Sequence, residues 1–139
     1  MTASIILTIL LATVTQFIVG AIWYTPLFGQ LWGKIHGFDK LDKKVQKEMM
    51  SKMGPIFGVQ FAVTLVTSVM LTLFHTALPT FSLYTLTLGI WLGFVAPSQV
   101  SGILFGGVEE KWMITKAAIM AGGSLIGLFA GAMVVSLIG

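Results

Sequence analysis

Four long apolar stretches, separated by short polar segments, dominate the pattern of hydrophobic and polar positions along the chain. We place them at residues 4–24, 55–78, 83–105 and 112–138. A helix needs about 20 predominantly apolar residues to cross the hydrocarbon core of a bilayer, and each stretch is long enough. The pattern therefore predicts an all-α integral membrane protein, with four transmembrane helices forming a single membrane domain over residues 1–139.

The polar segment after the first span predicts one further helix, over residues 39–53. Its apolar positions recur at four-residue steps: Leu41, Val45, Met49 and Met53. Asp39 is the expected N-cap, and Gly54-Pro55 is expected to end this helix and begin the second span. A basic amphipathic helix is suited to the headgroup layer, so we expect a cytoplasmic interfacial helix. A solvated helix or a partner-binding segment is the alternative.

The charges predict the direction of the spans. All eight lysines and all five acidic residues lie within segments 34–52 and 109–116, which follow the first and third spans. Lysine-rich short loops stay on the cytoplasmic side of a membrane. We therefore expect both charged loops in the cytoplasm, beside anionic lipid headgroups, and both termini outside.

Composition supports a lipid environment and narrows the chemistry. Charged residues make up 9% of the chain and hydrophobic residues 56%, and the mean hydropathy is +0.96. The chain has no cysteine, which excludes disulfides and thiolate metal sites. It also has no arginine, the residue best suited to bidentate phosphate recognition. We therefore expect the lipid bilayer as a partner, no nucleic acid, no metal and no cofactor, and no enzymatic activity.

The second span carries a continuous polar face. Its members recur at helical spacing: Gln60, Thr64, Thr67, Ser68, Thr72 and His75. Polar side chains inside a membrane face protein or water rather than lipid tails. They indicate either bonds that hold helices together or the hydrophilic lining of a path for a small solute or ion.

The third span adds a proline with polar neighbours, Pro97, Ser98, Gln99 and Ser101. Proline removes one backbone hydrogen bond and is expected to kink this helix. Gln16, Gln60 and Gln99 lie at similar distances from the charged loops, so they could form one polar layer. The leading interpretation is an oligomeric membrane protein with a solute or ion path. The alternative is a structural or partner-binding protein without transport.

Glycines at four-residue spacing mark the fourth span, at Gly123, Gly127 and Gly131. Such a groove lets a second backbone approach closely. It predicts tight helix packing, either within the chain or between copies, and a homo-oligomer is expected.

The end of the first span carries a motif of aromatic residues, glycines and a proline: Gly20, Trp23, Tyr24, Pro26, Phe28, Gly29 and Trp32. Tryptophan and tyrosine suit the headgroup level, and Pro26 with Gly29 is expected to end the span and turn the chain. The motif resembles the signature of a widespread bacterial family of small four-span membrane proteins of unknown function. The resemblance implies this fold and a bacterial inner membrane, and it implies no mechanism.

A short internal repeat accompanies the motif. Gly20-x2-Trp23-x2-Pro26 and Trp91-x-Gly93-x3-Pro97 both lie late in the first span of their half of the chain. Each half would enter from outside, form a charged loop and return, an arrangement that some transporters use.

Overall fold

The computed structural model describes residues 2–139, and all of its regular elements are helical. Four helical segments are long and apolar enough to cross a membrane: Ala3–Leu27, Met53–Ala77, Leu83–Leu104 and Glu110–Ile138. They match the four predicted spans to within a few residues. The helices of these spans are α1 (Ala3–Ile22), α4 (Met53–Ala77), α5 (Leu83–Ile90), α6 (Ala96–Leu104) and α7 (Met113–Ile138).

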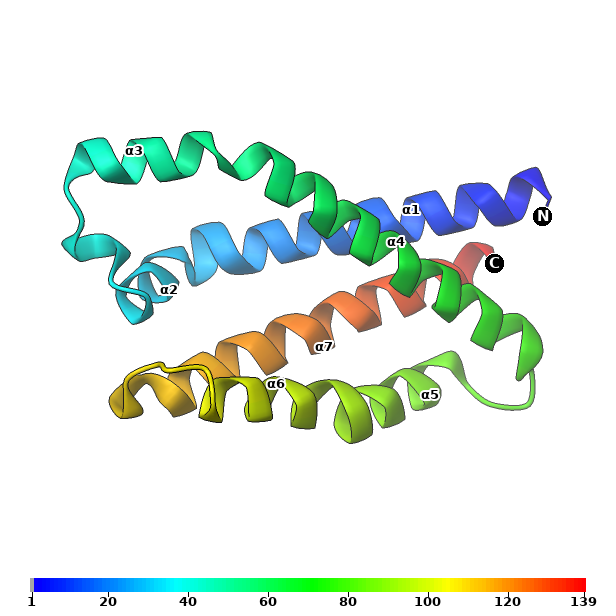
Figure 1. Ribbon diagram of the computed structural model, residues 1–139. Coiled ribbons are helices and arrows are strands. Elements are labelled where there is room, and N and C mark those ends of the chain that lie inside the picture. The colour runs from blue at the N-terminus through cyan, green and yellow to red at the C-terminus, as the bar shows by residue number, and fades with distance from the viewer. Residues whose placement is uncertain (1) are drawn as a thin grey trace.

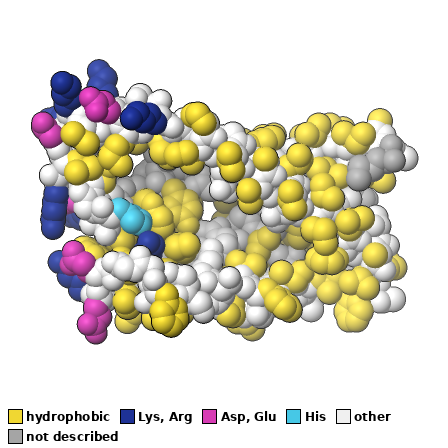
Figure 2. Space-filling view, in the orientation of Figure 1, with side chains coloured by type: hydrophobic (Ala, Val, Ile, Leu, Met, Phe, Trp, Pro, Cys, Tyr) yellow, Lys and Arg dark blue, Asp and Glu magenta, His cyan; other side chains and the backbone are white. Residues whose placement is uncertain are grey.

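The four spans run back and forth, so that both termini lie at the same end of the bundle (Figure 1). α7 packs along α1, and it also contacts α4, α5 and α6. We call the end formed by residues 34–52 and 106–116 the charged end, because every lysine, aspartate and glutamate lies there. Figure 2 shows these side chains gathered on one side, with hydrophobic side chains covering much of the remaining visible surface.

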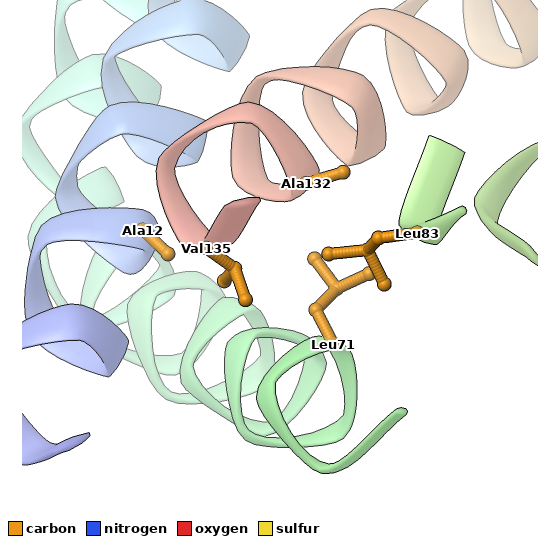
Figure 3. Packing of buried hydrophobic residues seen from close by; sticks show 5 residues of the cluster. All are labelled: Ala12, Leu71, Leu83, Ala132 and Val135. Carbon is orange, nitrogen blue, oxygen red and sulfur yellow. The ribbon is translucent and has the colours of Figure 1, made fainter. Parts of the chain in front are cut away.

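The apolar core lies toward the opposite end of the bundle. Five buried side chains from four helices form it: Ala12, Leu71, Leu83, Ala132 and Val135 (Figure 3). Ala12, Ala132 and Val135 have no exposed surface. The side chains of Leu71 and Leu83 point toward one another beside Ala132 and Val135 of α7. Because these α7 side chains are small, α1, α4 and α5 can all approach α7.

Short π-helical segments interrupt the first and third spans, at η1 (Trp23–Leu27) and η3 (Trp91–Val95). Pro26 was expected to end the first span; it lies inside η1, and the span ends one residue later, at Leu27. A π-turn bonds residues five apart, as in the bond from the Phe28 N–H to the Trp23 carbonyl (3.0 Å). Pro97 likewise directly follows η3, in the first turn of α6, where a missing N–H costs little.

The charged end contains α2 (Gly29–Ile35), a 3₁₀ turn η2 (Phe38–Lys40) and α3 (Lys43–Ser51). The predicted loop helix thus begins later than Asp39, because residues 38–41 form a separate turn. Gln46 ties the two together by donating to the carbonyls of Phe38 (2.9 Å) and Leu41 (3.1 Å). The break before the second span falls at Lys52, so Gly54-Pro55 lies in the first turn of α4 rather than between the helices.

Candidate functional site

A closed polar contact joins α1 and α4 inside the bundle. Gln16 donates one amide hydrogen to Ser68 Oγ (2.8 Å) and the other to the Ala12 carbonyl (3.2 Å). Thr13 Oγ1 lies 2.9 Å from the same Ser68 oxygen and 2.7 Å from the Ile9 carbonyl. Thr13 and Ser68 are fully buried and Gln16 is 8% exposed. The Gln16 amide N–H groups and the two hydroxyl groups therefore bond to one another and to their own helices.

The remaining polar residues of α4 mostly bond along their own helix. Hydroxyl groups of Thr64, Thr67, Ser68 and Thr72 each reach the carbonyl four residues earlier, at 2.8, 3.4, 3.2 and 2.9 Å. Such bonds satisfy hydroxyl groups without a partner helix. Gln60 is exposed and bonds only to Thr64 Oγ1 (3.3 Å), and His75 is half-buried. Among residues 2–139, every buried side-chain nitrogen or oxygen has a hydrogen-bond partner.

The polar residues of the third span lie apart from those of α4. Gln99 Oε1 is 3.0 Å from the hydroxyl of Ser124 on α7. The indole N–H of Trp91 donates to that hydroxyl (3.1 Å) and to the Ala121 carbonyl (2.9 Å). Pro97, Ser98 and Ser101 are exposed. Gln16, Gln60 and Gln99 therefore bond to three different partners rather than to one another.

The indole ring of Trp23 packs against α7 with its N–H edge. Its indole N–H donates to the Ile119 carbonyl (2.9 Å). A Cβ atom added at Gly122 or Gly123 would come within 2.9 Å of the Trp23 ring. The two glycines thus make the space that the ring occupies. Tyr24 Oη would lie 3.2 Å from a Cβ atom added at Gly123.

A row of aromatic rings continues from Trp23 to the charged end. Trp23 lies against Phe28 (ring centroids 4.6 Å apart), and Tyr24 meets Trp32 edge-on (5.0 Å). Trp32 in turn packs on His36 (4.5 Å), and Lys116 Nζ of α7 lies 5.7 Å from the Trp32 ring centre. Gly29 starts α2 where a Cβ would come within 3.0 Å of the Tyr24 carbonyl. The ring contacts hold α2 against η1, and Lys116 over Trp32 brings the beginning of α7 close to α2.

The three evenly spaced glycines of α7 have unequal surroundings. A Cβ added at Gly131 would come within 2.6 Å of Gln16 Nε2 and 2.9 Å of Leu71 Cδ1. Gly123 adjoins Trp23, as above. At Gly127 an added Cβ would meet none of the described atoms within 4 Å. Within the chain the close approach is therefore made at two positions rather than along a continuous groove, and at Gly123 the contact is an indole ring.

The structure has a cleft of about 400 Å³ at the charged end and a partly open cavity of about 70 Å³ between α4, α5 and α7. The cleft lies between the α2–η2 segment and the residues around η4 (Glu110–Trp112), and its walls carry four lysines. The cavity lies beside Thr67, Thr87 and Leu128 and is almost entirely apolar. No group of three His, Asp or Glu side chains suited to holding a metal occurs in residues 2–139.

Comparison with protein families gives one match. A family model described as protein of unknown function (DUF1761) covers residues 7–137, nearly the whole chain. The chain belongs to this family. Comparison with curated proteins and with solved structures finds no match. The family has no described function, so a functional proposal has to rest on the structure of this chain.

Several residues that hold this DUF1761 chain together could not be identified from the sequence alone. Trp91 was noted only as part of a repeat, yet Trp23 and Trp91 both begin a π-helical segment and both donate to α7 carbonyls. Thr13, Gly122 and Ser124 were not singled out. Their sequence signal is weak, because isolated small residues in an apolar span are common, and only the packing reveals their neighbours.

Proposed function

We propose that this DUF1761 chain is a structural, non-transport membrane protein whose helices are held together by their polar residues, rather than a solute path. The observation that carries the proposal is the Gln16–Ser68–Thr13 contact. A path through the bundle needs polar groups that face water. Here the most buried polar groups of α1 and α4 face one another, so they supply adhesion between the two spans.

The small cavity beside α4 also supports this proposal. A water molecule takes about 30 Å³ of liquid volume and needs two to four polar partners. The cavity volume is about 70 Å³ and its lining is apolar, so it offers few partners to a hydrated ion.

Thiol labelling tests the proposal, because the chain has no native cysteine. In the membrane, Ser68→Cys and Thr64→Cys should resist a water-soluble maleimide, as should Ala132→Cys, the control for a fully buried site. Lys44→Cys on the exposed face of α3 should react within the same time. Rapid reaction of Ser68→Cys at the rate of Lys44→Cys would refute the adhesive role.

A solute or ion path is the second candidate function, and exposed Gln60 favours it. Gln60 lies seven residues into α4, about 10 Å from its start. An amide at that depth avoids lipid tails, so a second copy of the chain or water would cover it. The path would then run between the subunits of a homo-oligomer. Reaction of Gln60→Cys together with protection of Ser68→Cys would favour this candidate.

We also propose that the charged end faces the cytoplasm, with α3 lying in the headgroup layer of a bacterial inner membrane. The lysine distribution supports the orientation. The exposure of Val45 (41%), Met49 (47%) and Met50 (59%) supports the placement of α3, since these side chains would reach the acyl boundary. In intact cells, an impermeant maleimide should label Thr80→Cys directly and Lys44→Cys only after permeabilisation. The reverse pattern would invert the proposed topology.

A further inference from the structure

The cleft at the charged end has the dimensions and the charge of a ligand site. Its volume of about 400 Å³ lies within the range of about 300–1,000 Å³ that is typical of small-molecule pockets. Two segments far apart in sequence form its walls, residues 34–40 and 106–116. Each contains a glycine in the left-handed region, Gly37 (φ 73°) and Gly107 (φ 79°), where the chain turns at little cost.

The lining is electropositive. Four lysines, Lys34, Lys40, Lys111 and Lys116, face two carboxylates, Asp39 and Glu109, so the net charge of the walls is +2 with His36 neutral. Lysine side chains gather at this end in Figure 2. A cleft lined by one sign of charge concentrates ions of the other sign.

Most of these ammonium groups keep their hydrogen-bonding capacity. The one ion pair in residues 2–139 joins Lys111 to Glu109 at 3.4 Å, with both side chains about two-thirds exposed. Lys34 and Lys40 form no ion pair with the described residues. Lys116 lies over the Trp32 ring, an interaction that leaves its N–H donors available on the side facing the cleft.

We propose that this cleft binds a phosphate group, either on a soluble phosphate monoester or on the headgroup of an anionic lipid. Lysine binds phosphate as a point charge with three donors, and three lysines approach one opening without a carboxylate partner. The cleft lies at the end of the bundle where headgroups would be, so a ligand could enter from the leaflet or from water. This inference does not depend on whether the bundle conducts a solute.

The test compares two triple variants with the same change in charge. Lys34→Gln/Lys40→Gln/Lys116→Gln removes the three available lysines of the cleft. Lys43→Gln/Lys44→Gln/Lys47→Gln removes three lysines of α3 that do not line it. Each is reconstituted in phosphatidylcholine nanodiscs and titrated with inorganic phosphate by phosphorus NMR. In a second arm, retention of phosphatidic acid is measured by native mass spectrometry.

We expect the cleft triple to bind at least about tenfold more weakly than the native chain, because each lost charge-assisted hydrogen bond is worth about that factor. The α3 triple should bind like the native chain. A difference with inorganic phosphate shows that the site takes a phosphate group free of lipid, and a difference with phosphatidic acid alone shows that it needs the lipid headgroup; both support the site. Equal binding by the two triples, or no binding by the native chain in either arm, overturns it.

A further variant distinguishes a loss of phosphate binding from a loss of folding. Lys34→Gln/Lys40→Gln changes only exposed side chains and keeps Lys116 on Trp32. Its helix content and elution volume should match those of the native chain while binding is still weakened. Native binding by this folded double variant, alongside a misfolded triple, would also overturn the proposal.

Discussion

The two ends of the bundle are held together by different kinds of contact. In what we call the closed half, which holds the five-residue core and the Gln16–Ser68 contact, apolar side chains interlock and polar side chains pair with one another. At the charged end, ring contacts hold α2 against η1, and a cleft with three available lysines is left open.

This difference separates stability from binding. Side chains of the closed half are fully engaged, so replacing them should change how tightly the helices pack. The lysines of the charged end have few contacts to lose, so replacing them should change what the protein binds. Each of the following variants tests one side of that division.

Leu71→Ala should have the largest effect. Leu71 is 4% exposed in the core, and truncation of such a residue costs about 2–5 kcal/mol of unfolding free energy. Its neighbour Leu73 is 47% exposed toward the surroundings of the bundle, so Leu73→Ala serves as the control and should cost far less. Unfolding by SDS in bicelles, followed by tryptophan fluorescence, measures both. Equal losses would mean that the core does not hold the bundle.

Gly131→Ala should cost about 1–3 kcal/mol, the usual penalty of overpacking. The new methyl group would meet Gln16 and Leu71, and Gln16 would have to leave Ser68 to make room. Gly127→Ala is the matched control, since its methyl group meets none of the described atoms within 4 Å. Both changes raise helix propensity by about 1 kcal/mol, so the difference between their unfolding free energies isolates the packing term. Indistinguishable variants would contradict the close approach at Gly131.

Ser68→Ala should cost about 1–3 kcal/mol, because it leaves a buried amide hydrogen of Gln16 without an acceptor. Adding Gln16→Leu to that variant should recover part of the loss by removing the orphaned donor. A double-mutant cycle of unfolding free energies measures this coupling. Thr67→Val provides a control, because the Thr67 hydroxyl bonds only to its own helix. Additive losses at Ser68 and Gln16 would show that the contact contributes nothing of its own.

Glu109→Gln should have the smallest effect on stability, below about 1 kcal/mol. Its pair with Lys111 is largely exposed, and such pairs contribute little and are screened by salt. The same variant removes one carboxylate from the cleft wall, so phosphate binding should strengthen at low ionic strength. Unfolding curves and phosphate titrations at two salt concentrations measure both. A large loss of stability with unchanged binding would reverse the division between the two ends.

The spans could be predicted because length and hydropathy alone determine them. Local rules located the end of the first span to within one residue, because Pro26 lies just before the last residue of η1, Leu27. They failed at the start of the loop helix. Asp39 is a suitable cap by type, yet Gly37 in the left-handed region sets a separate 3₁₀ turn before α3 begins.

The site depends on contacts that no local pattern encodes. Trp23 and its acceptor Ile119 are 96 residues apart, and the two walls of the cleft come from opposite halves of the chain. The spacing of the polar residues of the second span puts them on one face of α4. Which of them meet α1 and which stay exposed depends on the angle at which α4 crosses its neighbours, and sequence spacing does not determine that angle.

The bonds from Trp23 and Trp91 to α7 have a consequence for how the protein is made. A ribosome delivers the chain from its N-terminus, so α7 is the last of these four spans to leave it. Until then both indole N–H groups lack their acceptors, Ile119 and Ala121. The packing of these four spans should therefore be completed late, when α7 reaches Trp23 and Trp91. A chain truncated after Phe105 would keep both indoles accessible to an aqueous quencher, and release of the last helix would end that exposure.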